Sequence, residues 1–177
     1  DPKKKLKYGW RLIEFHDGTW AGIDTGIPNR LVKGALTAGA IPELADYPII
    51  KPEQKYGTNS RVDFLLQKPD CPDAYVEVKS VTLQRYAGLA EFPDSVTDRG
   101  AKHLAELAEV ARAGHRAVLF YVVQRTGCTR VQVAGDIDPT YAAAYKVALD
   151  AGVEVIAYGT KIDQFGVTLA GPLEHLR

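Results

Sequence analysis

One stretch of the sequence, residues 60–82, constrains the fold most strongly. Two segments rich in Val, Leu, Phe and Tyr, residues 60–67 and 74–82, have the composition of β-strands. The segment between them, residues 68–73, is dense in Pro and Asp, which is typical of a turn. We therefore predict an antiparallel β-hairpin here.

The predicted hairpin brings two acidic side chains together. Side chains alternate between the two faces of a strand, so Glu77 and Lys79 share a face. On the other strand, Asp63 lies roughly opposite Glu77. Opposed carboxylates repel each other across strands, and a divalent cation is the simplest compensation. The alternative is a solvated cluster of cross-strand ion pairs formed by the same three side chains.

This arrangement resembles the PD-(D/E)xK nuclease superfamily, in which an acid on one strand is followed by Glu-x-Lys on the next. The resemblance implies that Asp63, Glu77 and Lys79 are catalytic. Asp63 and Glu77 would ligate Mg²⁺ or Mn²⁺, with the Val78 carbonyl as a third ligand, because hard cations take oxygen ligands. Lys79 would orient the attacking water and offset the charge that develops on the phosphate.

Two features depart from the superfamily pattern. Val62 stands where the motif has a Pro, immediately before Asp63. Many members also carry a Glu on the first helix as a further metal ligand, but residues 30–38 contain no acid. Asn29, which we expect to cap that helix, is the only substitute, and an amide is a weak Mg²⁺ ligand. The absent helix Glu and the neutral net charge favour an alternative function, a DNA-binding regulatory protein that keeps the nuclease fold without cutting.

Longer matches are similar to the sugar fermentation stimulation protein family of bacteria and archaea. They lie at residues 59–66, 75–83, 92–104 and 122–125, and the resemblance extends over nearly the whole chain. Members are described as DNA-binding proteins with a nuclease-like domain preceded by a small OB-like domain. The resemblance implies DNA binding, Mg²⁺-dependent DNA hydrolysis as a candidate activity, and a link to the regulation of sugar (maltose) metabolism.

The remaining elements favour an α/β fold with a restriction-endonuclease-like mixed sheet flanked by helices. Helices are expected at residues 97–113 and 139–152, strands at 117–123 and 153–158, and a terminal hairpin at 161–169. We divide the chain into a β-rich hairpin segment, residues 1–24, and a nuclease-like domain, residues 25–177. The first is expected to be a remnant of, or a linker to, an OB-like domain.

Five side chains are expected to contact DNA: Arg61, Arg99, Lys102, His103 and Gln124. Three of them lie in the first turns of a predicted helix, whose N-terminus favours phosphate. Gln124 ends a buried strand at the edge where ligands bind in open α/β sheets. The alternative for Lys102 is an ion pair with Glu106 on the outer face of the helix.

The N-terminal segment carries aromatic residues beside basic ones. Trp10 and Trp20 flank a predicted hairpin turn, and exposed aromatic rings there would stack on bases. Because two Trp in one hairpin more often fill a core, we expect the core role. The lysine-rich start, residues 3–7, could bind phosphates, but we expect it to be a solvated linker.

Composition limits the class of protein. Lys plus Arg and Asp plus Glu both number 22, so DNA affinity must come from local patches and not from an overall basic charge. No apolar run approaches the roughly 20 residues of a membrane span, so we expect a cytoplasmic protein that avoids membranes. The start at Asp1 and the absence of Met suggest a fragment. DNA is the expected partner, and a homodimer is left open.

Overall fold

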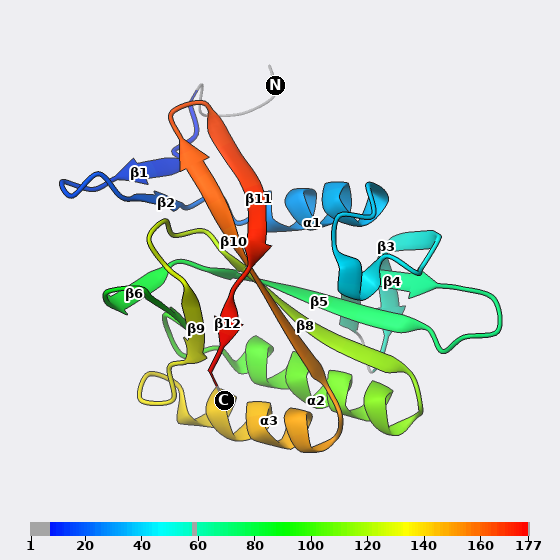
Figure 1. Ribbon diagram of the computed structural model, residues 1–177. Helices are drawn as coiled ribbons and strands as arrows, with labels where there is room; N and C mark the ends of the chain where they lie inside the picture. The colour runs from blue at the N-terminus through cyan, green and yellow to red at the C-terminus, as the bar shows by residue number, and fades with distance from the viewer. Residues whose placement is uncertain (1–7, 58–59, 177) are drawn as a thin grey trace.

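A computed structural model of the chain describes residues 8–57 and 60–176 (Figure 1). A six-stranded mixed sheet lies at its centre, with a four-stranded sheet beside it and helices on both faces. The predicted α/β fold with a mixed sheet flanked by helices is confirmed.

The elements follow one another along the chain in a β-rich order. The strands are β1 (Leu12–Glu14), β2 (Trp20–Gly22), β3 (Ile49–Tyr56), β4 (Ser60–Gln67), β5 (Ala74–Val81), β6 (Leu83–Tyr86), β7 (Leu89–Phe92), β8 (Arg116–Val123), β9 (Arg130–Val133), β10 (Glu154–Asp163), β11 (Gly166–Pro172) and β12 (Glu174–His175). The helices are α1 (Ile27–Thr37), the short 3₁₀ helix η1 (Pro42–Leu44), α2 (Asp98–Arg112) and α3 (Pro139–Asp150).

The central sheet has the order β11-β10-β8-β5-β4-β3. Strands β5, β8 and β10 are parallel, while β4 and β3 form an antiparallel meander on β5. The predicted hairpin is therefore confirmed as β4 and β5. Their ladder runs from Leu66–Ala74 to Phe64–Val76, after which the two strands separate. On its other side β5 stays paired with β8 as far as Val81, so only one edge of β5 opens.

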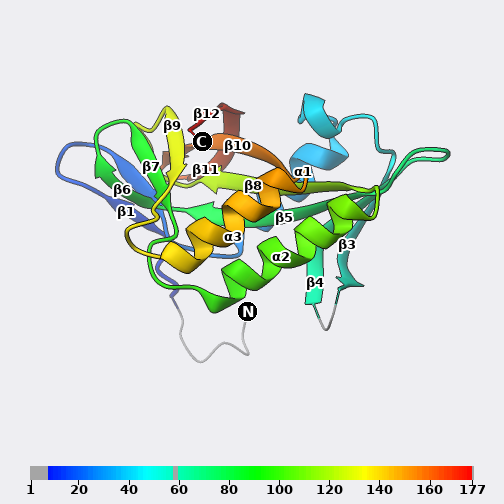
Figure 2. The same ribbon diagram turned by 90° about the horizontal axis from the view of Figure 1, so that it is seen from below.

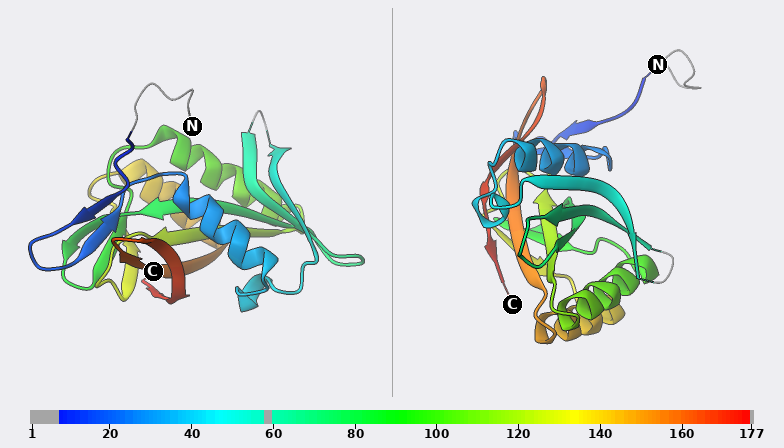
Figure 3. Two further views of the ribbon diagram at one scale, coloured as in Figure 1. Left: turned by 90° about the horizontal axis from the view of Figure 1, so that it is seen from above. Right: turned by 90° about the vertical axis from the view of Figure 1, so that its right-hand side faces the viewer.

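Two hydrophobic cores hold the sheet between helices. Helix α1 covers one face, while α2 and α3 cover the other (Figures 2 and 3). Strand β8 contributes to both cores by alternation: Phe120 faces α1, and Tyr121 faces α2 and α3. The Tyr121 hydroxyl shares a 2.9 Å hydrogen bond with the hydroxyl of Tyr141 on α3. This burial on both faces agrees with the continuously apolar sequence of the strand.

The start of α1 differs from the sequence prediction. The helix begins at Ile27, with Gly26 at the N-cap and Pro28 in the first turn. Pro is well suited to this position because its fixed φ matches the helix and its missing N–H needs no partner. Asn29 therefore does not cap the helix, and its side chain is available for another contact.

A second sheet was not predicted. It has the order β12-β9-β7-β6 and lies beside the end of the central sheet (Figure 1). Residues 83–92 form its β6–β7 hairpin. Strand β9 pairs with β7 in parallel over only four residues, from Arg130 to Val133. Such a short non-local pairing leaves little periodic signal in the sequence.

The N-terminal hairpin β1–β2 is attached to the end of β8. The Gly22 N–H donates to the Gln124 carbonyl at 2.9 Å, and the Trp20 N–H donates to Thr126 Oγ1 at 2.7 Å. The expected core role of Trp10 is wrong, because this residue is 76% exposed. The predicted lysine-rich linker, residues 3–7, lies outside the described residues. Assignment of residues 1–24 to an OB-like domain stays a prediction.

Two negative findings apply to the described part of the chain. None of its helices has both the length and the apolar character needed to cross a membrane. Cys71 and Cys128 are both free thiols.

Close packing of α2 on α3 generates a prediction about Gly100. A Cβ at this position would lie 2.7 Å from Thr97 Cγ2 and 3.1 Å from Tyr141 Cδ2. Neither neighbour moves easily, since Thr97 Oγ1 caps the helix by accepting from the Gly100 N–H at 3.0 Å and Tyr141 is fully buried. Gly100→Ala should therefore lower the free energy of unfolding by about 1–3 kcal/mol in urea denaturation.

The matched control is Gly34→Ala inside α1, where an added Cβ meets no atom within 4 Å. Since Gly inside a helix costs roughly 0.5–1 kcal/mol relative to Ala, this variant should be more stable than the wild type by about that amount. A Gly100→Ala protein as stable as Gly34→Ala would contradict the packing argument.

Candidate functional site

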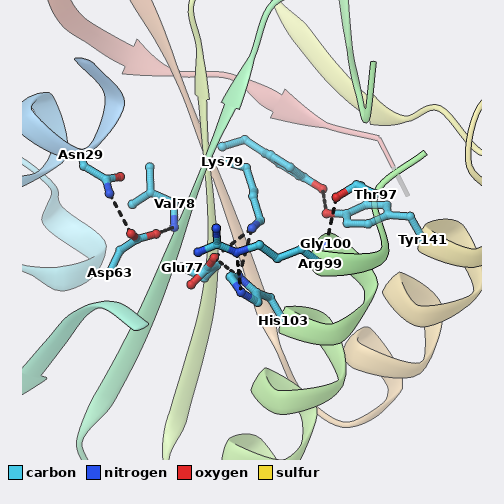
Figure 4. A network of polar contacts seen from close by, with 11 residues as sticks. Asn29, Asp63, Glu77, Val78, Lys79, Thr97, Arg99, Gly100, His103 and Tyr141 are labelled. Carbon is cyan, nitrogen blue, oxygen red and sulfur yellow. Dashed lines mark hydrogen bonds and ion pairs between the residues drawn. The ribbon is translucent and has the colours of Figure 1, made fainter. Parts of the chain in front are cut away.

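The predicted catalytic residues lie near one another where β4 leaves β5, beside the first turns of α2 (Figure 4). Glu77 and Lys79 project from β5 toward α2, and Asp63 reaches in from β4. His103 and Arg99 come from α2 on the opposite side. Three separate elements therefore build the site.

Glu77 is the centre of this network. Glu77 is only 3% exposed, so it is not part of a solvated cluster of ion pairs, the alternative that the sequence left open. Oε1 accepts a hydrogen bond from Lys79 Nζ at 2.8 Å and is also in hydrogen-bond contact with His103 Nδ1. Oε2 is buried and has no hydrogen-bond partner among the residues that the structure describes. One carboxylate oxygen is thus saturated and the other is left for a ligand.

The contacts of His103 fix its tautomer. Arg99 Nε lies 3.3 Å from His103 Nε2 and can only donate, so Nε2 is the acceptor. The ring proton is then on Nδ1 and is donated to Glu77 Oε1. Lys79 Nζ, 3.2 Å from the same Nδ1, bonds Glu77 directly. His103 therefore acts on Glu77 as a hydrogen-bond donor.

The surroundings of Glu77 keep its carboxylate ionised. Burial raises the pKa of Glu77, but the hydrogen bond from His103 and the charge of Lys79 outweigh it and hold the pKa below its usual value. The side chain of Lys79 is itself 14% exposed, so it reaches solvent beside the carboxylate. An ionised Glu77 with a free oxygen is suited to bind a cation.

Asp63 is held in a different way. Its Oδ1 accepts from Asn29 Nδ2 at 2.7 Å, and its Oδ2 accepts from the Val78 backbone N–H at 2.8 Å. This N–H is free because β4 has already separated from β5, so the side chain replaces the lost ladder bond. Burial and then the charge of Glu77 raise the pKa of Asp63 above its usual value, partly offset by these hydrogen bonds.

The first turns of α2 present basic side chains beside the site. Thr97 caps the helix, as the predicted boundary at this residue implied, and Arg99 is exposed. Lys102 is half-exposed, with Nζ 3.8 Å from Glu106 Oε1. His103, in contrast, is 5% exposed and faces Glu77. Of the three helix residues predicted to contact DNA, Arg99 and Lys102 are placed to reach a ligand in solvent.

The other two predicted DNA contacts lie apart from this cluster. Arg61 is exposed on β4 and forms a 3.8 Å ion pair with Glu53 on the neighbouring strand. Gln124 is fully buried, and its Nε2 donates to Ser80 Oγ at 2.9 Å. A ligand cannot reach Gln124 in this conformation, so this residue is not part of the proposed DNA interface.

Two carboxylates of the site, those of Asp63 and Glu77, could bind a metal ion. Across residues 8–57 and 60–176, no group of three or more His, Cys, Asp or Glu side chains is arranged to hold a metal ion. Asp63 and Glu77 nevertheless fit a hard cation, because Glu77 Oε2 is buried without a partner and carboxylate oxygens are the preferred ligands. Mg²⁺ commonly takes one or two carboxylates and keeps several waters, which such a site permits.

Two contacts of the site were missed by sequence reasoning. Asn29 was considered as a metal ligand, but in the structure it orients Asp63 from α1. His103 was considered as a DNA contact, but it orients Glu77. The available signal was positional: Asn29 is the polar residue at the start of α1, and His103 lies one turn after Arg99 on α2. Only the packing of the helices on the sheet assigns their partners.

Comparisons with known proteins agree with this fold. A family model described as "Sugar fermentation stimulation protein RE domain" matches residues 26–166. The sugar fermentation stimulation protein homolog of Jannaschia sp. is 62% identical over 98% of this chain and 72% of its own length. That of Roseobacter denitrificans is 59% identical over 98% of this chain and 74% of its own length.

A solved structure gives the same result in three dimensions. The chain is similar to SfsA of Pyrococcus furiosus, whose structure was solved in complex with Ca²⁺, with a TM-score of 0.85 and 32% sequence identity. The match covers 93% of this chain and 70% of the other. The resemblance drawn from the sequence motifs is thereby confirmed, and the chain belongs to the sugar fermentation stimulation protein family.

Proposed function

We propose that this chain binds DNA and hydrolyses its phosphodiester bonds with the help of a divalent cation. One observation carries the proposal: the ionised, buried Glu77 carboxylate keeps one oxygen without a partner in the described structure, beside Lys79 and near Asp63. A buried charge with an unused oxygen is costly unless a ligand completes it. The complex of the Pyrococcus furiosus protein with Ca²⁺ supports a divalent cation as that ligand.

Asp63 and Glu77 would hold Mg²⁺ or Mn²⁺, and the Val78 carbonyl is proposed as a further oxygen ligand. When bound, the cation would supply positive charge to polarise the phosphate. Asn29 and the Val78 N–H would keep Asp63 in position while it shares its carboxylate. His103 would hold the Glu77 carboxylate through Oε1 and leave Oε2 for the ligand.

Lys79 would act at the scissile phosphate. Its Nζ is fixed 2.8 Å from Glu77 Oε1, and the side chain still reaches solvent. A cation held at this position would orient the attacking water and stabilise the negative charge that grows in the transition state. Arg99 and Lys102, exposed on the first turns of α2, would contact neighbouring phosphates, and Arg61 would do so from β4.

One observation favours a second candidate, a DNA-binding regulator that does not cut. The residue on α1 that contacts Asp63 is the neutral Asn29, so the site has one acid fewer than many nucleases of this superfamily. This candidate would be supported over the hydrolase if EDTA does not change DNA binding in a mobility-shift assay and no cleavage occurs in Mg²⁺ or Mn²⁺.

The metal proposal predicts the outcome of calorimetric titrations with Mg²⁺, Mn²⁺ and Ca²⁺. Asp63→Ala and Glu77→Gln should each weaken binding by more than the roughly 10- to 100-fold typical of residues that only support a ligand. The control is Glu154→Gln, which should bind the cations like the wild type. Glu154 begins β10 and pairs with Arg116, which begins the neighbouring strand β8. Equal weak heats from wild type and Asp63→Ala would exclude this site.

The same titration should depend on pH in a defined direction. Because burial and the charge of Glu77 raise the pKa of Asp63, its carboxyl takes up a proton at a pH above the ordinary value of 3.8. Protons compete with the cation, so affinity should fall as pH is lowered through this raised pKa. Affinity that stays constant until pH 3.8 would show that Asp63 is not a ligand.

Lys79 and Arg99 should differ in kinetics. On plasmid and oligonucleotide substrates, Lys79→Ala should lower the cleavage rate by about 10²–10³ while changing DNA affinity little, because its contact forms mainly in the transition state. Arg99→Ala should weaken binding and reduce the slope of log affinity against log salt by about 1. Arg112→Ala, in the last turn of the same helix, should change neither the cleavage rate nor the DNA affinity and its dependence on salt.

This contrast separates the two candidate functions. If Lys79→Ala only weakens DNA binding, with a shallower salt slope and no separate effect on rate, Lys79 is a phosphate contact like Arg99. The hydrolase proposal would then give way to the DNA-binding regulator.

A further inference from the structure

A further acid, Glu106, lies beside the site at one turn of α2 after His103. Its side chain is 12% exposed, and within the described residues neither carboxylate oxygen has a hydrogen-bond partner. Lys102 Nζ forms an ion pair with Oε1 at 3.8 Å, a distance too long for a hydrogen bond. Gly57 allows this burial, since a Cβ there would lie 3.0 Å from Glu106 Oε1. A carboxylate enclosed in this way, with an ion pair but no hydrogen bond to either oxygen, is stabilised by a further ligand.

Tyr56, at the end of β3, points its hydroxyl into the same region. The residue is 8% exposed, and its hydroxyl is buried without a partner in the part of the chain that is described. The ring packs against Tyr75, with 5.9 Å between the centroids. Burial raises the pKa of this hydroxyl, and the charges of Glu77, Glu106 and Asp63 raise it further. The hydroxyl is therefore neutral and available as a hydrogen-bond donor in the pocket that it shares with Glu106.

These groups converge from different elements. Tyr56 comes from β3, Glu106 from α2 and Glu77 from β5, and the first two line a pocket of about 390 Å³ together with Tyr75. Tyr75 precedes Glu77 by two residues on β5 and therefore lies on the same sheet face. The Tyr56 hydroxyl and both Glu106 oxygens, all buried without described partners, therefore lie in a pocket next to the strand and helix that carry Glu77 and His103.

The arrangement suits a hydrated cation better than a bare one. The described acids are not close enough for three of them to ligate one ion directly. Mg²⁺ dehydrates reluctantly and usually keeps several waters, whose hydrogens need acceptors. Glu106 offers a charged acceptor, and the Tyr56 hydroxyl can either donate or accept.

We propose that Glu106 and Tyr56 are positioning residues of the metal site, which bind the hydration shell of the cation held by Asp63 and Glu77. Glu106 thereby supplies, from α2, the acid that α1 lacks. This inference rests on the proposed function, because it requires that Asp63 and Glu77 bind a divalent cation.

The test is calorimetric titration of the full chain with MgCl₂ and CaCl₂. Glu106→Gln keeps the size of the side chain and removes its charge, and it should weaken Mg²⁺ binding by about 10- to 100-fold. Tyr56→Phe should weaken it less, since only one hydrogen bond is lost. Ca²⁺ binding should weaken less than Mg²⁺ binding in both variants, because Ca²⁺ takes more direct protein ligands and Mg²⁺ keeps its waters.

The matched control is Glu154→Gln on β10, whose carboxylate pairs with Arg116 and lies outside the pocket of Tyr56 and Glu106, and it should bind both cations like the wild type. Melting in EDTA separates binding from folding: Glu106→Gln and Tyr56→Phe should melt close to the wild type without metal and gain less stability from Mg²⁺. Should Glu106→Gln fail to fold, Tyr56→Phe carries the test alone.

Two outcomes overturn the inference and are distinguishable. Unchanged Mg²⁺ affinity in both variants, with wild-type binding that still depends on Glu77, would reject the roles of Glu106 and Tyr56 and leave the proposed function intact. A wild-type protein that binds neither cation would reject both proposals together.

Discussion

Burial of the Glu77 carboxylate is the constraint on which the site depends. A charge taken out of water is costly unless it is paired and hydrogen-bonded, and Glu77 is 3% exposed. Lys79 from the same strand supplies the opposite charge, but the hydrogen bond from His103 requires α2 to lie close against β5. On its other side α2 packs closely on α3, which Gly100 permits, because any side chain there would meet Thr97 and Tyr141. The hydrogen bond that stabilises the buried Glu77 carboxylate therefore depends on how α2 is packed.

The separation of β4 from β5 is the second feature on which the site depends, because it positions Asp63. If the ladder continued past Phe64, the Val78 N–H would be used by the backbone of β4 and not by Asp63. The opening lets a second carboxylate approach Glu77, and the repulsion between them appears as the raised pKa of Asp63, to which burial contributes most. Two carboxylates held in this way, one of them with an unused oxygen, form a site that a divalent cation would stabilise.

The sequence was informative where the signal is local. Alternation along residues 60–82 was enough to place Glu77 and Lys79 on one face and Asp63 near them, and Thr97 marked the start of α2 correctly. Contacts made by helix packing were not predictable: His103 meets Glu77 across 26 positions, and Asn29 meets Asp63 across 34. The burial of Gln124 was not predictable either, because the end of β8 is covered by the N-terminal hairpin, where a Cβ on Gly22 would lie 2.7 Å from Gln124 Oε1.

The most direct test of the central claim is anomalous diffraction from crystals grown or soaked with Mn²⁺, collected on both sides of the manganese absorption edge. We predict one strong anomalous peak between the Asp63 and Glu77 carboxylates, which disappears in Glu77→Gln crystals treated identically. A fully ordered site at high Mn²⁺ with no peak there, and with Lys79 and His103 still the only groups on Glu77, would contradict this claim.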